Sequence, residues 1–261
     1  MADPRPLDLR NPRILITNDD GINAPGLGVL ERIAGQLSHD VWAVAPEMEQ
    51  SATSHSLTVR RPLRLRHLDT RHYAVDGTPT DCVVVAARKV LQDHPPDLVL
   101  SGVNHGSNLG EDVTYSGTVA AAMEAALLGL PAIALSQAHR GDHRFQWQTA
   151  ERHAAEVIRR VAKTGFFADS LVNVNFPDRA PEEVVGTRVC PQGRRDLDAG
   201  VVEGLDPGGR PYIWIGDYAG DVCRVGNSDL TAVADGWIAV TPLHLDLTHR
   251  TLLGQLEEAF A

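Results

Sequence analysis

Short apolar segments alternate with helical patterns along most of this chain, and this alternation limits the possible fold more than any other feature. Five segments have the length and composition of buried β-strands: RILIT (13–17), VWAVA (41–45), DLVLSG (97–102), AIALS (132–136) and LVNVNF (171–176). Amphipathic or Ala-rich helical stretches lie between most of them. Strands that alternate with helices predict an α/β fold, in which helices cover both faces of a mostly parallel sheet.

Two stretches break the alternation. Residues 57–75 are expected to form a two-stranded ribbon beside the main sheet. Residues 184–225 are rich in Gly, Pro and charge with short strand-like pieces, and they predict an extended β arm that projects from a single domain spanning 1–261. The apolar piece YIWI (212–215) is difficult to bury within such an arm, so it indicates a homo-oligomer interface.

Composition excludes several classes of protein. A formal net charge of −10 argues against a long nucleic-acid footprint, although a bound metal ion could still attract a small phosphorylated ligand. The three cysteines, Cys82, Cys190 and Cys223, show no close pairing and are expected to be buried or incidental thiols. No apolar run reaches the roughly 20 residues of a membrane span, and the N-terminus lacks a signal-peptide core, so a cytoplasmic location is expected.

Two adjacent acids, Asp19 and Asp20, directly follow the first predicted strand. Ligands of open parallel sheets bind beyond the carboxyl ends of the strands, where the loops 46–56, 103–118 and 137–143 should also meet. A carboxylate pair near Ser hydroxyls and Asn amides suits a hard divalent cation, Mg²⁺ or Mn²⁺. Taken alone, the DDG sequence is equally typical of a helix-capping turn, and the convergence of oxygen-rich loops favours the metal site.

A second kind of site is indicated at Ser116, Gly117 and Thr118, which begin an Ala-rich helix. Free backbone N–H groups and the helix dipole can bind an anion there, and Gly117 would let the backbone approach it, with a positive φ as a further possible role. One of the two hydroxyls is expected to be only a helix N-cap. An acid pair that binds a metal ion and faces a phosphate site at a helix N-terminus is typical of phosphoryl transfer.

Six motifs also occur here in the order found in a known family. They are ILITNDDGINAPG, VAPEMEQSATSHSLT, DGTPTDCV, SGVNHGSNLGEDVTYSGTVAAAMEA, NVNFP and VTPLHLDLT. Together, from about Arg13 to Thr248, they resemble the SurE family of stationary-phase survival proteins, which are metal-dependent nucleoside-monophosphate phosphatases. The resemblance implies a Rossmann-like core, one divalent cation per subunit, and a homodimer or homotetramer built partly through the C-terminal arm.

Residue by residue, the resemblance implies four metal ligands and four residues near the phosphate. The implied ligands are Asp19, Asp20, Ser51 and Asn104, and the implied phosphate-binding residues are Asn108, Ser116, Gly117 and Thr118. The chain departs from the family in the loop 46–56, where Met48 and Gln50 replace basic residues and His55 replaces an Asn. These changes leave the ligand set intact and affect the expected substrate preference.

The resemblance and the two indicated sites together predict hydrolysis of nucleoside 5'- and 3'-monophosphates to nucleoside and phosphate. Water attacks phosphorus in line, and Asp19 or Asp20 positions or deprotonates that water. Attack by an aspartate through a phospho-aspartate is the alternative mechanism, and the sequence does not separate the two.

Two other classes of protein are considered. A receiver-like phosphoacceptor switch also has paired acids after its first strand and binds Mg²⁺, but it needs a further Asp and a Lys where this chain has Ser101, Asn104 and the sequence IALSQ. A dinucleotide-binding module needs G-x-G-x-x-G after the first strand, and NDDGINAPG lacks it.

Overall fold

The central element is a nine-stranded sheet with the order β3-β4-β2-β1-β5-β6-β7-β11-β8, and β9 and β10 form a separate two-stranded sheet. The computed structural model describes residues 6–141, 144–195, 199–218 and 226–261. The strands are β1 (Arg13–Thr17), β2 (Asp40–Pro46), β3 (Leu65–His67), β4 (His72–Val75), β5 (Leu98–His105), β6 (Ala132–Gln137), β7 (Ser170–Phe176), β8 (Gly186–Val189), β9 (Ala199–Leu205), β10 (Pro211–Tyr218) and β11 (Trp237–His244).

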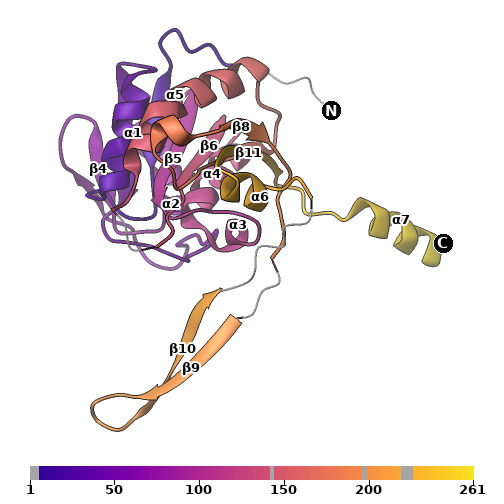
Figure 1. Cartoon of the computed structure of the whole chain (residues 1–261). Helices are drawn as coiled ribbons and strands as arrows, with labels where there is room; N and C mark the ends of the chain where they lie inside the picture. The colour runs from indigo at the N-terminus through magenta and orange to yellow at the C-terminus, as the bar shows by residue number, and fades with distance from the viewer. Residues whose placement is uncertain (1–5, 142–143, 196–198, 219–225) are drawn as a thin grey trace.

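Helices cover both faces of this sheet (Figure 1). They are α1 (Pro25–Gly35), α2 (Pro79–Val85), η1 (Ala86–Val90), α3 (Asp112–Tyr115), α4 (Gly117–Leu127), α5 (Trp147–Thr164), η2 (Pro181–Glu183), α6 (Asp229–Ala234) and α7 (Arg250–Ala259). Helices α1 and α5 pack against one face, and α2 and α4 pack against the other.

The apolar character of the central strands follows from this arrangement. In β1, Ile14 and Ile16 belong to the core beneath α1 and α5, while Leu15 belongs to the core beneath α2 and α4. Because both faces of a parallel sheet are covered, successive side chains are apolar on either side. The predicted α/β fold and all five predicted core strands are therefore confirmed.

The position of β1 determines where a ligand can bind. Strand β1 pairs in parallel with β2 on one side and with β5 on the other. The strand order therefore reverses at β1: β2 and β4 extend the sheet on one side, and β5, β6 and β7 extend it on the other. Such a switch in strand order opens a crevice at the carboxyl ends of the two strands. Here the loops after β1, β2 and β5 begin at that edge.

The ribbon expected at 57–75 is part of the main sheet. Strands β3 and β4 do form an antiparallel pair, but β4 also pairs in parallel with β2, from Ala43 opposite His72 to Pro46 opposite Val75. The expected two-stranded ribbon is therefore present, but it continues the main sheet instead of lying beside it, because β4 pairs with the edge of β2 that β1 leaves free.

The predicted arm is real but shorter than 184–225. Strand β8 lies in the main sheet next to β11, which runs antiparallel to β7, and neither strand was predicted. Within 184–225, the part that stands away from the body among the described residues is the antiparallel hairpin β9–β10 (Figure 1). Helix α7 also extends from the body and contains no buried residue.

Two of the expected thiols lie in the described part of the chain. Cys82 and Cys190 are buried and free, as expected, whereas Cys223 lies outside the described residues. Among the helices that the structure describes, none is both long enough and apolar enough to cross a membrane.

Candidate functional site

A closed turn after β1 places the two adjacent acids at the crevice. The Gly21 N–H donates to Asn18 Oδ1 at 3.2 Å, and Asn18 Nδ2 donates back to the Gly21 carbonyl at 3.0 Å. Gly21 has a φ of 101°, a conformation that favours glycine. Within this turn Asp19 is only 5% exposed, while the side chain of Asp20 is partly open to solvent.

Asp19 lies in a cluster of oxygen-bearing side chains from three elements. The Thr118 hydroxyl, at the start of α4, donates to Asp19 Oδ1. The same hydroxyl lies 3.3 Å from Asn104 Oδ1, near the end of β5. Asn104 Nδ2 donates to the Gly106 carbonyl at 2.9 Å, which keeps the amide oxygen on the side of Thr118. The fold therefore brings together residues from positions 19, 104 and 118.

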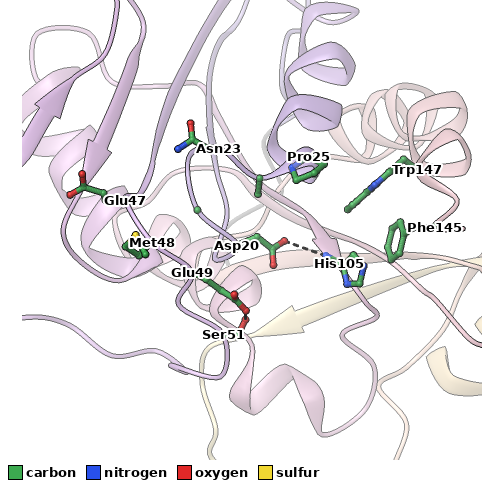
Figure 2. Close-up of a pocket in the computed structure, with 13 residues that line it drawn as sticks. Asp20, Asn23, Pro25, Glu47, Met48, Glu49, Ser51, His105, Phe145 and Trp147 are labelled. Atoms are coloured by element: carbon green, nitrogen blue, oxygen red, sulfur yellow. Dashed lines mark hydrogen bonds between the residues drawn. The ribbon is translucent and has the colours of Figure 1, made fainter. Parts of the chain in front are cut away.

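Asp20 faces an open cavity of about 720 Å³ (Figure 2). The His105 N–H donates to Asp20 Oδ2 at 3.3 Å. Ser51 lines the same cavity, and its hydroxyl donates to Glu49 Oε1 at 2.7 Å. The structure thus places Ser51 beside the cavity that Asp20 borders, with its hydroxyl turned to a neighbouring carboxylate.

The N-terminus of α4 lies against Asp19. Ser116 is the N-cap, because its hydroxyl accepts from the Val119 N–H at 3.0 Å, so the N-cap expectation is confirmed for Ser116. A Cβ built on Gly117 would lie 2.8 Å from Asp19 Cβ and 3.0 Å from Asp19 Oδ2. Gly117 is not among the residues with positive φ, so that suggested role was wrong. Its small size is needed for the close approach of the helix to the carboxylate.

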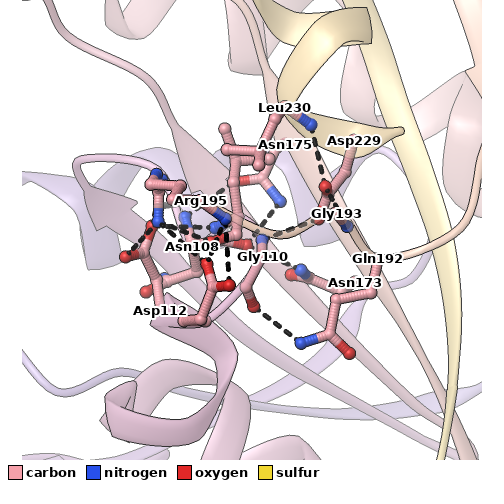
Figure 3. A network of polar contacts seen from close by, with 12 residues as sticks. Asn108, Gly110, Asp112, Asn173, Asn175, Gln192, Gly193, Arg195, Asp229 and Leu230 are labelled. Carbon is pink, nitrogen blue, oxygen red and sulfur yellow. Dashed lines mark hydrogen bonds and ion pairs between the residues drawn. The ribbon is translucent and has the colours of Figure 1, made fainter. Parts of the chain in front are cut away.

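Asn108 is buried in a polar network at the ends of β6 and β7 (Figure 3). Its N–H donates to Asn175 Oδ1 at 2.8 Å, and its Nδ2 donates to Ser136 Oγ at 2.8 Å. Its carbonyl accepts from Asn173 Nδ2 at 2.8 Å. These contacts fix the loop between β5 and α4 to the ends of β6 and β7.

The same loop is held by two residues that the sequence did not single out. Asp229, fully buried at the start of α6, accepts from the Gly110 N–H at 2.9 Å and from the Gly193 N–H at 2.7 Å. Arg195 donates to both carboxylate oxygens of Asp112 at 2.8 Å each (Figure 3). The segment that leads to the β9–β10 hairpin is thereby joined to the loop that carries the candidate site.

Burial controls the electrostatics of the acid pair. Desolvation raises the pKa of Asp19 from 3.8 to about 6; hydrogen bonds from Thr118 oppose the shift, and the Asp20 charge adds to it. Burial also raises the pKa of Asp20. Two neighbouring carboxylates with raised pKa values are a destabilising arrangement unless a cation is bound between them.

The ligand chemistry of the cluster fits a hard divalent cation. Among the described residues there is no group of three or more His, Cys, Asp and Glu side chains that could hold a metal ion. The candidate donors are instead carboxylate, amide and hydroxyl oxygens, at Asp19, Asp20, Asn104 and Ser51. Oxygen ligands of this kind suit Mg²⁺ or Mn²⁺, whereas zinc sites are usually rich in thiolate and imidazole ligands.

Comparison with known proteins decides the family. A family model described as survival protein SurE matches residues 14–199. The chain belongs to the SurE family. The family resemblance indicated by the six motifs is thereby confirmed.

Similar proteins cover almost the whole chain. Proteins named 5'-nucleotidase SurE from Paramagnetospirillum magneticum and Brucella canis are each 55% identical, over 100% and 95% of this chain and 98% of each relative. The crystal structure of a SurE protein from Aquifex aeolicus is 39% identical and matches with a TM-score of 0.82, over 95% of this chain and 99% of that chain.

Some residues of the cavity escaped the sequence analysis. Glu49, Phe145 and Trp147 line it together with Asp20 and other residues. Phe145 and Trp147 follow the loop 137–143 that was expected to reach the site. They lie just before and at the start of α5, and both line the cavity. Aromatic residues at a helix start give no distinctive signal in the sequence.

We expect Asp19→Asn to stabilise the metal-free protein at pH 7.5. The pKa of Asp19 is about 6 in the folded protein, above the ordinary aspartate value of 3.8. Its carboxyl therefore destabilises the fold increasingly as the pH rises from about 4 to 6, and fully above that range. The gain is about 3 kcal/mol at pH 7.5 and disappears near pH 4. Urea unfolding in EDTA measures it, with the exposed Asp93→Asn as control. An equal change in the free energy of unfolding at pH 7.5 and at pH 4 would contradict the raised pKa of Asp19.

We expect Gly117→Ala to weaken Mn²⁺ binding and catalysis together. The new Cβ must displace either Asp19 or the start of α4, because the contact of 2.8 Å is shorter than real Cβ contacts allow. Calorimetric titration of Mn²⁺ and the rate of phosphate release should both fall at least tenfold. Gly28→Ala is the matched control, since its Cβ would meet only Arg32 Nη1 at 3.7 Å. Unchanged Mn²⁺ affinity in Gly117→Ala would refute this role of Gly117.

Proposed function

We propose that this chain is a metal-dependent phosphomonoesterase that hydrolyses nucleoside 5'- and 3'-monophosphates. The observation that carries the proposal is the buried Asp19 carboxylate, held beside Asp20 and against the N-terminus of α4 at the switch point of the sheet. The names of the two relatives that are 55% identical support the same activity.

Asp19, Asp20, Ser51 and Asn104 are the proposed ligands of one Mg²⁺ or Mn²⁺ per subunit. The Ser51 hydroxyl, which now donates to Glu49, would turn toward the acid pair. When bound, the cation supplies Lewis-acid charge to a phosphate oxygen and neutralises the carboxylates. The oxygen-only ligand set and the raised pKa values of Asp19 and Asp20 support this assignment.

Asn108, Ser116, Gly117 and Thr118 are the proposed phosphate-binding residues. Helix α4 is 11 residues long, and the positive end of its dipole lies at the acid pair, where the phosphate must bind. Ser116 contributes as the N-cap that holds the first turn in place. Asn108 Nδ2 donates to Ser136 Oγ in this structure, so Asn108 also fixes the loop that would carry it to the phosphate.

The two acids have different surroundings, and this separates their roles. Asp19 is buried and accepts from Thr118, so it serves to hold the cation. Asp20 borders the cavity, and it is therefore the carboxylate that can position or deprotonate an attacking water. Direct attack on phosphorus by a carboxylate would also have to use Asp20.

We also propose that the β9–β10 hairpin joins subunits into a homodimer or homotetramer. Exposed apolar side chains gather on it, at Val201, Val202, Ile213, Trp214 and Ile215, and Ile215 is 73% exposed. A projecting ribbon with this much exposed apolar surface is typical of a protein interface.

We also propose that the protein acts in the cytoplasm.

We expect wild-type protein to release phosphate from nucleoside monophosphates, and to stop doing so in EDTA. Adding Mg²⁺ or Mn²⁺ should restore the rate. Asp20→Asn should lower kcat at least a hundredfold while circular dichroism stays unchanged, because it removes charge at nearly constant shape. Asp93→Asn controls for a surface carboxyl. Release that resists EDTA, or full activity in Asp20→Asn, would refute the proposed mechanism.

We expect light scattering to give a mass that is a multiple of the 28.2 kDa chain. The double variant Ile213→Asp and Ile215→Asp should lower that mass, because it places charge in the apolar patch of the hairpin. Leu127→Asp, at an exposed position of α4, is the control and should leave the mass unchanged. A wild-type mass of one chain across micromolar concentrations would refute the interface.

A further inference from the structure

Three aromatic rings gather at one end of the cavity that Asp20 borders (Figure 2). The rings of His105 and Phe145 are stacked, with centroids 4.1 Å apart and planes inclined by 21°. The centroid of Trp147 lies 4.1 Å from that of Phe145 and 6.0 Å from that of His105. We call these three residues the aromatic cluster.

The aromatic cluster is fixed in relation to the acid pair. The backbone of His105 donates to Asp20, so the imidazole and the carboxylate are adjacent. Trp147 begins α5 and packs against α1, where a Cβ on Gly26 would come within 3.0 Å of its ring. Phe145 contacts both of the other rings. The cluster is therefore a preformed part of the cavity wall.

The rings are open to the cavity. His105 is exposed, and Phe145 and Trp147 are only half-buried. The apolar core beneath α1 and α5 includes Trp147 as a partly buried neighbour, but it does not include Phe145. The apolar core therefore does not account for Phe145 and His105. Outside the cluster, their rings lie near that of His139, with centroids 5.0 Å and 6.0 Å away.

The size of the cavity and the charges in it narrow the choice of ligand. About 720 Å³ is more than a phosphate group needs and lies within the roughly 300–1,000 Å³ of small-molecule sites. Glu47 and Glu49 also line the cavity. Their carboxylates would repel a second phosphate group on the ligand, and they can accept hydrogen bonds from amino groups. The cavity therefore suits a ligand with one phosphate and a flat, uncharged ring.

We propose that the aromatic cluster is the nucleobase subsite, on which the base of a nucleoside monophosphate stacks while its phosphate lies at Asp20. The inference rests on the proposed function and names the residues that select a nucleotide over other phosphomonoesters. Stacking on an aromatic side chain contributes about 1–3 kcal/mol per base and depends little on the identity of the base. The subsite thus favours nucleotides in general and disfavours sugar phosphates.

The test compares adenosine 5'-monophosphate with ribose 5-phosphate, which lacks the base. Wild-type protein should prefer the nucleotide in kcat/KM. Phe145→Ala should reduce that preference about 5- to 150-fold, chiefly through KM, because the lost stacking acts on the nucleotide alone. Phe145→Tyr keeps a ring and should restore the preference. Phe167→Ala, a half-exposed aromatic before the amino end of β7, is the matched control and should leave the preference unchanged.

Two results would overturn the subsite. One is a wild-type protein without preference for the nucleotide, and the other is an unchanged preference in Phe145→Ala, whether kcat/KM stays the same or falls equally for both substrates. Calorimetric titration of Mn²⁺ shows whether Phe145→Ala has kept its fold and acid pair. If wild-type protein hydrolyses neither substrate, the proposed function fails, and calorimetric binding of the same nucleotide to wild type and Phe145→Ala still decides the subsite.

Discussion

The burial of Asp19 beside Asp20 is the constraint on which the rest of the site depends. Burial raises the pKa of Asp19 to about 6, and Asp20 adds repulsion, so the metal-free fold holds this pair at a cost in stability. The Thr118 hydroxyl offsets part of that cost through its hydrogen bond to Asp19. A divalent cation would offset the remainder. The proposed cation would therefore supply the positive charge that offsets this cost.

Such an arrangement needs a rigid frame, because a flexible loop would let the two carboxylates move apart. The frame has two parts. The turn closed by Asn18 and Gly21 fixes the acids after β1. Asp229 and Arg195 fix the loop between β5 and α4 (Figure 3). This loop starts directly after Asn104 and His105 at the end of β5 and ends at Ser116, the N-cap of α4. Arg195 precedes the β9–β10 hairpin, so a subunit interface on that hairpin would adjoin the frame of the site.

The sequence predicted those features that depend on local patterns. The doubly covered strands of the sheet are continuous apolar runs, and the Asp pair directly follows one of them, so both could be recognised. Strand β11 was missed because it lies outside the alternation of strands and helices, between β7 and the edge strand β8, and follows a Gly-rich region. The close contact of Gly117 with Asp19, and the approach of Phe145 to His105, depend on how distant segments pack, and no local pattern encodes them.

The central claim is that Asp19, Asp20, Ser51 and Asn104 hold one divalent cation. Anomalous X-ray diffraction from crystals equilibrated with Mn²⁺ tests it most directly, since it locates the ion without relying on activity. The account predicts one strong peak per subunit within about 2–2.5 Å of oxygens from these side chains, with the Ser51 hydroxyl turned away from Glu49. No peak at this position at saturating Mn²⁺, or a peak held by other residues, would contradict it.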